Sequence, residues 1–251
     1  MRVTLITATY NSGASIKSCL DSVVSQNYDD FEYLIIDGKS SDDTLSIVKH
    51  YQQKYSYIKL ISEKDQGIYD ALNKGVMLAT GDVIGFVHSD DLLASKTVIS
   101  EIVAILKNES LDGVYGDLEY VRKEDITKVV RFWNSRSFNS KLLSKGWMPA
   151  HPTLFLKKEV YEKHGFFNLT YQISADYDFM LRILKDDSLK FGYLPKVITK
   201  MRIGGASNGS INNIIKKTKE DYRAIRSNHI GGWFSILIKN TSKIKQLFIR
   251  G

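Results

Sequence analysis

The chain has 251 residues, of which 43% are hydrophobic and 25% charged, and its formal net charge is +7. This composition is that of an ordinary globular protein and excludes a disordered, collagen-like or coiled-coil chain. The length is enough for one large α/β domain or two small ones. The one cysteine, Cys19, cannot form an internal disulfide, and its place on the apolar side of an expected helix predicts a buried, unreactive thiol.

The first 120 residues alternate between strand and helix patterns. We expect strands at Val3–Thr9, Tyr33–Ile36, Ile58–Ile61 and Val83–Val87, and helices at Ser15–Gln26, from residues 41–44 through Tyr51, at Gly67–Ala79 and at Lys96–Leu106. Single helices between successive strands predict βαβ units and a parallel sheet. Ligands of such sheets bind beyond the carboxyl ends of the strands.

The second half has a mixed pattern. We expect strands at Gly113–Arg122, Lys128–Trp133 and Thr153–Lys157, a long connection at Asn134–Ala150, a helix at Ala175–Lys185 and strands within Leu189–Arg202. Loops as long as this connection are usually functional. The sequence therefore predicts one α/β domain over residues 1–215, with a mixed α+β half at 121–215 that follows a mainly parallel half at 1–120.

The positive charge is concentrated in a C-terminal tail at residues 216–251. This tail has nine basic and two acidic residues, whereas residues 1–215 are neutral. Its basic residues are mixed with aromatic and aliphatic ones, which is typical of an amphipathic segment on an anionic membrane surface. The alternative is one or two terminal helices packed on the body. We find no nucleic-acid-binding motif, export signal or membrane span, so we expect a cytoplasmic protein, peripheral on the inner face of the membrane, that binds no nucleic acid.

Polar residues follow three of the expected strands, at 7–11, at Asp37 and at 88–91. Each group alone is typical of turns and helix caps, but together at one sheet edge they predict a site. Asp90 and Asp91 follow a buried strand, and adjacent carboxylates there suit Mg²⁺ or Mn²⁺. The chain has no GxGxxG, P-loop, GxSxG or spaced histidine motif, which weighs against dehydrogenases, P-loop enzymes, serine hydrolases and zinc hydrolases.

Five segments resemble the motifs of inverting glycosyltransferases of family 2, in the order in which that family has them. They are TATYN at 7–11, IIDGKSSDDT at 35–44, EKDQGIYDALNKG at 63–75, ATGD at 79–82 and SDD at 89–91. A sixth, ISADYDFMLR at 173–182, resembles the segment that holds the catalytic base. The resemblance implies a GT-A fold, related to Rossmann folds, with the nucleotide-binding half at 1–120 and the acceptor-side half at 121–215.

The resemblance also implies roles for individual residues. The nucleotide sugar would be held by Thr7, Thr9, Asn11, Asp37, Lys64, Asp65 and Asp90, and the divalent metal, Mn²⁺ or Mg²⁺, by Asp91. His88 stands where the family usually has another residue and receives no role.

The expected catalytic base is Asp176, in the first turn of the helix predicted at Ala175–Lys185. The helix dipole there stabilises a carboxylate, so a purely structural role is the alternative. Asp178 is the second candidate for the base, although two residues along a helix point to different faces. His151 and Arg202 are assigned to the acceptor or diphosphate side, against the alternatives of a structural imidazole and a surface arginine.

These residues predict a metal-dependent hexosyl- or N-acetylhexosaminyl-transferase. It would move the sugar of a nucleoside-diphosphate sugar, UDP by preference, to a hydroxyl of a glycan or polyprenyl-linked acceptor in surface polysaccharide biosynthesis. A nucleotidyltransferase, which would release pyrophosphate, and a non-catalytic nucleotide-sugar-binding protein are the alternatives.

Overall fold

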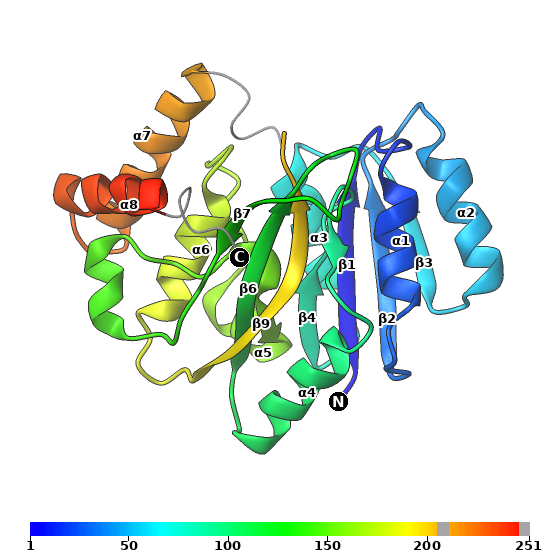
Figure 1. The fold of residues 1–251 in the computed structure, drawn as a ribbon, viewed down its shortest axis with the longest axis horizontal. Helices are drawn as coiled ribbons and strands as arrows, with labels where there is room; N and C mark the ends of the chain where they lie inside the picture. Colours follow the sequence, from blue (N-terminus) through cyan, green and yellow to red (C-terminus); the bar gives the residue numbers. More distant parts are fainter. Residues whose placement is uncertain (205–210, 246–251) are drawn as a thin grey trace.

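The computed structural model describes residues 1–204 and 211–245 (Figure 1). The strands are β1 (Val3–Thr9), β2 (Phe31–Asp37), β3 (Ile58–Ser62), β4 (Val83–Phe86), β5 (Leu92–Leu93), β6 (Gly113–Val121), β7 (Val129–Trp133), β8 (Phe155–Lys157) and β9 (Phe191–Arg202). The helices are α1 (Ile16–Val24), α2 (Thr44–Lys54), α3 (Ile68–Leu78), α4 (Val98–Asn108), α5 (Lys158–His164), α6 (Ala175–Leu184), α7 (Ile211–Ser227) and α8 (Trp233–Lys245), with 3₁₀ turns η1 (Ser140–Lys145) and η2 (His151–Thr153).

Within the described residues, nine strands form one sheet in the order β3-β2-β1-β4-β8-β6-β9-β5, and β7 pairs with β6. Strands β3, β2, β1 and β4 are parallel. Strand β8 runs antiparallel to both β4 and β6, whereas β9 is parallel to β6. The predicted α/β organisation is confirmed, with a parallel first half and a mixed second half.

Helices cover both faces of the sheet and form two apolar cores. One core joins the sheet to α1, α2 and α4, and the other joins it to α3, α5 and α6. Every residue of β1 and β2 is buried, which explains why these strands read as continuous runs instead of alternating patterns. Alternate residues of β1 therefore face opposite cores, and Ala8 faces the α3 side while Thr7 faces the α1 side.

The expected long connection at Asn134–Ala150 contains a 3₁₀ turn, η1, that the sequence analysis did not predict. Asn139 caps it by accepting a hydrogen bond from the amide of Lys141 at 3.0 Å, and Gly146 ends it with φ +69°. A Cβ at Gly146 would lie 2.7 Å from the Cβ of Lys239 in α8. The turn therefore depends on a helix almost one hundred residues away in the sequence.

The C-terminal helices pack on the rest of the chain beside α6, at the end of the molecule opposite α2 (Figure 1). Helix α7 begins at Ile211, so the expected boundary at residue 216 falls inside a helix. Ala224, Ile225 and Ile236 belong to the core on the α3 side. None of the described helices combines the length and the apolar character needed to cross a bilayer. The last residues of the predicted tail, 246–251, lie outside the described residues.

Candidate functional site

A cavity of about 620 Å³ opens where α3, α6 and the strand ends meet. Its walls come from three distant parts of the sequence. The first part contributes Ala8, Tyr69, His88, Ser89 and Asp90, the second contributes Met148, His151, Asp176 and Tyr177, and the C-terminal helices contribute Asn213, Lys216, Lys217, Asp221 and Lys239. Of the residues expected at a site, the cavity therefore brings together Asp90, His151 and Asp176.

Asp176 lies in the first turn of α6 and is oriented by Tyr69 of α3. The Tyr69 hydroxyl donates to Asp176 Oδ1 at 3.1 Å and to the carbonyl oxygen of Ile173 at 2.6 Å. Burial raises the pKa of the Tyr69 phenol, and the Asp176 charge raises it further, so the hydroxyl keeps its proton and remains a donor. The carboxylate thus faces the cavity with one oxygen held.

The segment before α6 is held by Glu220 of α7. Its carboxylate accepts hydrogen bonds from the amides of Gln172 at 3.1 Å, Ile173 at 2.8 Å and Ser174 at 3.0 Å. Amides that precede a helix have no partner within it, and a carboxylate there also interacts favourably with the helix dipole. A residue of the C-terminal helices therefore anchors the backbone next to Asp176.

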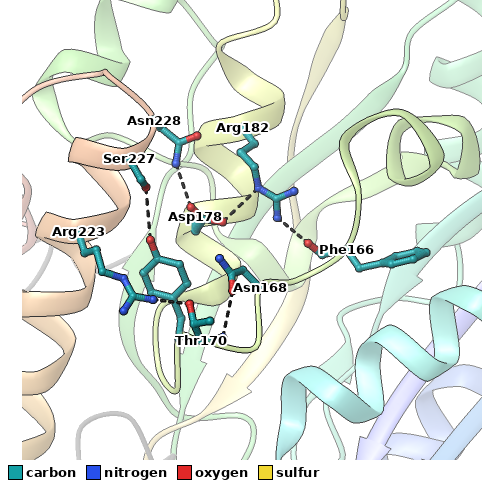
Figure 2. Close-up of a pocket in the computed structure, with 9 residues that line it drawn as sticks. Phe166, Asn168, Thr170, Asp178, Arg182, Arg223, Ser227 and Asn228 are labelled. Atoms are coloured by element: carbon teal, nitrogen blue, oxygen red, sulfur yellow. Dashed lines mark hydrogen bonds and ion pairs between the residues drawn. The ribbon is translucent and has the colours of Figure 1, made fainter.

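Asp178 belongs to a different hollow, of about 500 Å³, between α6 and α7 (Figure 2). Its carboxylate accepts from Asn228 Nδ2 at 3.0 Å and pairs with Arg182 Nε at 3.1 Å. Asp178 is 5% exposed. Asp178 thus links α6 to the end of α7, and only Asp176 of the two acids lines the larger cavity.

Two imidazoles lie side by side in the cavity. The rings of His88 and His151 are 6.1 Å apart, and His151 also stacks on Phe86 at 5.6 Å. Burial lowers the pKa of His151 to about 4, although the Asp176 charge opposes this shift. Burial likewise lowers the pKa of His88. Both rings are therefore neutral at pH 7, and His88, which received no role from the sequence, lines the same cavity as Asp176.

The turn after β4 holds the two acids of the SDD motif in different surroundings. Asp90 lines the cavity, whereas Asp91 is fully buried and accepts at Oδ1 from the amide of Arg202 at 3.3 Å. Burial raises the pKa of Asp91 well above its usual range, and the neighbouring Asp90 charge raises it further. Asp91 Oδ2 has no hydrogen-bond partner among the described residues. A buried carboxylate oxygen without a partner beside a second acid is a fit for a divalent cation.

Arg202 is not a surface arginine. It is 9% exposed, and its guanidinium donates to the carbonyl oxygens of Asp90 at 2.5 Å and Lys123 at 3.3 Å and to Ser18 Oγ at 2.9 Å. The alternative of a surface arginine is therefore excluded, because β9 brings this side chain against the acidic turn. Arg202 fixes the backbone that carries Asp90 and Asp91. Residues 205–207, which follow shortly after it, lie outside the described residues.

Asn11 and Asp37 tie two loops together at the carboxyl ends of β1 and β2. Asn11 Oδ1 accepts from the amide of Ser41 at 2.9 Å, and the Asn11 amide donates to Ser40 Oγ at 2.8 Å. The buried Asp37 carboxylate accepts from the hydroxyls of Ser40 at 2.5 Å and Ser62 at 2.6 Å. These contacts bring the expected nucleotide-binding residues to one sheet edge, although neither lines the cavity itself.

Thr7 and Thr9 of β1 are buried and do not line the cavity. The Thr7 hydroxyl contacts Tyr33 Oη at 2.8 Å and the carbonyl oxygen of Val87 at 2.5 Å, and Thr7 is fully buried. Thr9 is 4% exposed, and its hydroxyl has no partner among the described residues. Strand alternation turns the Thr7 side chain toward α1, and its expected contact with the nucleotide sugar stays a prediction.

Lys64 and Asp65 lie before α3. Lys64 is exposed, whereas Asp65 Oδ1 accepts from the amide of Gly67 at 2.9 Å. A Cβ at Gly38 would lie 2.5 Å from Asp65 Oδ2. Asp65 therefore packs against the loop after β2, and only a glycine fits there without moving it.

The sequence analysis missed Tyr69, Glu220, Lys217 and Lys239. Tyr69 stands within the third quoted motif, two residues after the glycine that precedes α3, and this place was a usable signal. The other three belong to helices that the charge pattern assigned to a membrane surface. Their role depends on the packing of α7 and α8, for which the local sequence has no signal.

Known glycosyltransferases are similar to this chain in sequence. The sequence family described as Glycosyl transferase family 2 matches residues 4–165. A Mycobacterium bovis protein described as a PGL/p-HBAD biosynthesis glycosyltransferase is 33% identical over 208 residues, which cover 81% of this chain and 78% of the relative. An uncharacterized glycosyltransferase of Methanocaldococcus jannaschii is 24% identical over 213 residues, covering 82% of this chain and 72% of that protein.

Solved structures share the fold. A fragment of S. aureus TarS in complex with UDP-GlcNAc aligns over 91% of this chain and 65% of its own, with a TM-score of 0.70 and 19% identity. The mannosyltransferase PcManGT of Pyrobaculum calidifontis, in complex with GDP-Man and Mn²⁺, aligns over 90% of this chain and 63% of its own, with a TM-score of 0.67 and 21% identity. The chain thus spans just under two thirds of each of these two solved chains, and the expected GT-A fold is confirmed.

The motifs at the sheet edge, the acids at the cavity and the match over residues 4–165 lead to one assignment: the chain is a glycosyltransferase of family 2.

Proposed function

We propose that the chain transfers a sugar from a UDP-sugar to an acceptor hydroxyl with inversion at the anomeric carbon. The observation that carries this proposal is that Asp90 and Asp176, from opposite halves of the chain, line one cavity. Asp90 has the position that suits a ribose and a metal-bound diphosphate, and Asp176 the position that suits an attacking hydroxyl. The nucleotide-sugar complexes of two proteins with this fold support a nucleotide-sugar donor.

The nucleotide would lie along the sheet edge formed by the loops that contain Asn11, Asp37, Lys64 and Asp65. The bonds of Asp37 to Ser40 and Ser62 would keep this loop in shape. Thr9, whose buried hydroxyl has no described partner, would come within reach of a base only if the loop moved. Thr7 would stabilise the position of β1 through its buried contacts with Tyr33 and Val87.

Asp91, with Asp90 beside it, would hold Mn²⁺ or Mg²⁺. The described residues contain no group of three or more His, Cys, Asp or Glu that could hold a metal ion, so phosphate oxygens and water would complete its coordination. When bound, such an ion stabilises the negative charge that grows on the departing diphosphate. Arg202 would keep the acidic turn in register through its bonds to the Asp90 carbonyl oxygen and the Asp91 carboxylate.

Asp176 would accept the proton of the acceptor hydroxyl as its oxygen attacks the anomeric carbon from the face opposite the diphosphate. Tyr69 would hold Asp176 Oδ1 and leave Oδ2 for the acceptor. Proton transfer to a positioned group of this kind contributes about 10²–10⁴-fold in rate. The neutral His151 would line the acceptor side.

The acceptor would be a glycan or a polyprenyl-linked sugar of a cell-surface polysaccharide, and the transferred group a hexose or an N-acetylhexosamine. A relative's role in PGL/p-HBAD biosynthesis supports an acceptor in such a pathway. The enzyme would work at the inner face of the membrane. What supports this location is the exposed apolar surface of α8, where Trp233, Phe234 and Leu237 are 64%, 74% and 59% exposed.

The test is incubation with a panel of nucleotide sugars and Mn²⁺ or Mg²⁺, followed by measurement of the released nucleotide. We expect UDP, not pyrophosphate, to accumulate with at least one UDP-sugar. Asp176→Asn should lower turnover by about 10²–10⁴-fold and leave the Kd for UDP near that of the wild type.

Asp178→Asn is the matched control, because Asp178 is two residues away and faces another hollow. It should keep turnover as long as the protein is folded. Release of pyrophosphate would identify a nucleotidyltransferase instead, and binding of UDP-sugar without turnover would identify a non-catalytic protein.

A further inference from the structure

One wall of the cavity is made by the C-terminal helices and has a composition unlike the rest. We call it the lysine wall, and it consists of Asn213, Lys216, Lys217 and Asp221 of α7 and Lys239 of α8. Among these described residues, three ammonium groups face one carboxylate. The remainder of the described lining consists of apolar and neutral polar side chains, the acids Asp90 and Asp176, and Arg131 on β7 as a further cation.

Lys239 is held inside the protein. It is 3% exposed, its Nζ lies 2.8 Å from Asp221 Oδ2, and the same nitrogen is 3.0 Å from the centroid of the Tyr177 ring. Burial lowers the pKa of Lys239 to about 8, against the opposing charge of Asp221, so the group is still mainly charged at pH 7. A buried ion pair is weak as a source of stability, because apolar residues of similar volume do as well. Its position in a cavity wall therefore points to a ligand.

Asp221 is shared between two lysines. Lys217 Nζ lies 3.4 Å from the same Oδ2 atom that Lys239 contacts. One carboxylate cannot neutralise two ammonium groups, and Lys216, which contacts Gln172 Oε1, adds a third. The lysine wall thus has three ammonium groups and one carboxylate, with the Asp176 charge also acting on Lys239, and this composition favours an anionic group.

The lysine wall lies beside Asp176 and away from the sheet edge. Lys239 contacts Tyr177, the residue next to Asp176, and the Asp176 charge acts on it. Asp90 comes from the turn after β4, and α6 stands between β4 and the pair α7 and α8 in Figure 1. A group bound at the lysine wall would therefore lie next to the proposed base, in the same cavity as Asp90.

We propose, on the basis of the proposed transferase function, that the lysine wall binds a phosphate group of the acceptor. Ammonium groups bind phosphate as point charges, whereas the forked guanidinium is the better match to a carboxylate. The amides of Asn213 and Gln172, which also line this part of the cavity, add neutral polar groups. The acceptor is thus a phosphate ester whose hydroxyl is aligned with Asp176 by the phosphate it carries.

The experiment titrates glucose 1-phosphate into the full-length protein, alone and in the presence of saturating UDP, and measures Kd by calorimetry at pH 7. Methyl glucoside is the neutral counterpart, and inorganic phosphate tests the anion without a sugar. We expect glucose 1-phosphate to bind when UDP is present. Methyl glucoside should bind at least about tenfold more weakly, because it lacks a hydrogen bond between charged groups. Competition between UDP and glucose 1-phosphate would overturn the proposal, because the lysines would then serve the diphosphate of the donor.

Two variants should shift the Kd for glucose 1-phosphate in opposite directions. Lys217→Gln should raise the Kd for glucose 1-phosphate about tenfold, whereas Asp221→Asn should lower it, because the excess of positive charge grows. Lys219→Gln, an exposed residue of the same helix, is the control and should leave the Kd unchanged. If Lys217→Gln and Asp221→Asn shift the Kd in the same direction, the lysine wall is structural and the proposal fails.

The UDP affinity of each variant is measured in the same series. Unchanged UDP binding shows that the variant is folded and that its nucleotide site is intact. If the wild type does not bind UDP, the proposed function is contradicted. The titration of glucose 1-phosphate without UDP would then still test the lysine wall.

Discussion

Two aspartates that stand two positions apart on α6 have different surroundings, and this difference separates chemistry from structure. Asp176 faces the large cavity with Tyr69 on one of its oxygens, whereas Asp178 is held by Arg182 and Asn228. A helix turns about 200° over two residues, so neighbours at this spacing cannot share a face. Because of this geometry, only one of the two aspartates can face the cavity.

Glu32 is a buried charge outside the site that determines how the protein responds to acid. Its carboxylate accepts from the Thr80 amide at 2.6 Å, the Thr4 hydroxyl at 2.8 Å and Lys59 Nζ at 3.0 Å. Burial opposes ionisation, but these donors, the Thr80 amide first, lower the pKa of Glu32 from 4.5 to about 2. The folded state thus binds this proton more weakly than the unfolded state does.

Glu32→Gln should flatten the pH dependence of stability. The contribution of the ionised carboxylate is fully present above pH 4.5 and is lost as the pH falls toward 2, because protonation then favours the unfolded state. Urea unfolding between pH 7 and 2 should show a free energy of unfolding that falls less steeply in this window for the variant. At pH 7 we expect a loss of roughly 1–3 kcal/mol, since a strong acceptor is replaced.

Glu162→Gln, which changes an exposed glutamate of α5, is the control for Glu32 and should follow the wild-type curve. Parallel curves for the wild type and Glu32→Gln below pH 4.5 would show that Glu32 does not carry this acid dependence.

At the scale of elements, α7 sets the position of α6. The three amides that precede α6 all donate to Glu220, and Asn228 at the end of α7 donates to Asp178 within α6. The two helices are therefore tied at two places, and the proposed base stands between them. Helix α8 in turn covers η1 through the close contact at Gly146.

Glu220→Gln should lower kcat while leaving the KM for the donor unchanged. The neutral amide accepts the three backbone bonds more weakly, so the segment at 172–174 and the carboxylate of Asp176 lose their fixed orientation. We expect about a tenfold loss in kcat, equivalent to about 1.4 kcal/mol of transition-state stabilisation. Steady-state kinetics with a donor found in the nucleotide-sugar panel provides the measurement.

A purely structural role for Glu220 would lower the amount of folded protein and leave kcat per folded molecule unchanged. Thermal unfolding of the same samples separates these outcomes. Lys219→Gln, the neighbouring exposed position, should match the wild type in both measurements.

At the scale of the whole molecule, the C-terminal helices present two different surfaces. Inward, Lys217, Asp221 and Lys239 line the cavity. Outward, α8 exposes Phe234 and Leu237. The positive charge of this region is therefore divided, because Lys239 is buried and only exposed residues such as Lys219 and Arg226 are available to a membrane.

The double variant Phe234→Ser and Leu237→Ser should abolish co-sedimentation with vesicles that contain anionic lipid, while hydrolysis of the donor stays as in the wild type. The apolar side chains provide the membrane contact in the proposed location, whereas both lie outside the cavity lining. Met77→Ser, at a position 60% exposed on α3, is the control and should bind vesicles normally. Equal sedimentation of the double variant and the wild type would show that α8 is not the membrane surface.

The fold of the first half was predictable because its signals are local. Runs such as Val3–Thr9 and the apolar spacing of α1, α3 and α4 are properties of consecutive residues, and the parallel order follows from single-helix crossovers. The direction of the Thr7 side chain could not be predicted, because strand alternation gives two faces but not which of them meets the site. The contacts of Arg202 could not be predicted for a similar reason, since only the pairing of β9 brings this residue against the acidic turn.

The sequence by itself determined the family, the α/β fold and the acids at the strand ends, because these depend on motifs and periodicities of neighbouring residues. Only the tertiary structure decided the use of the basic C-terminal residues. The sequence pattern of these basic residues is the same whether they face a membrane or a cavity. Which of the two they face depends on how α6, α7 and α8 pack, through contacts between residues far apart in the sequence. That packing turns part of the net charge of +7 inward, next to the proposed base.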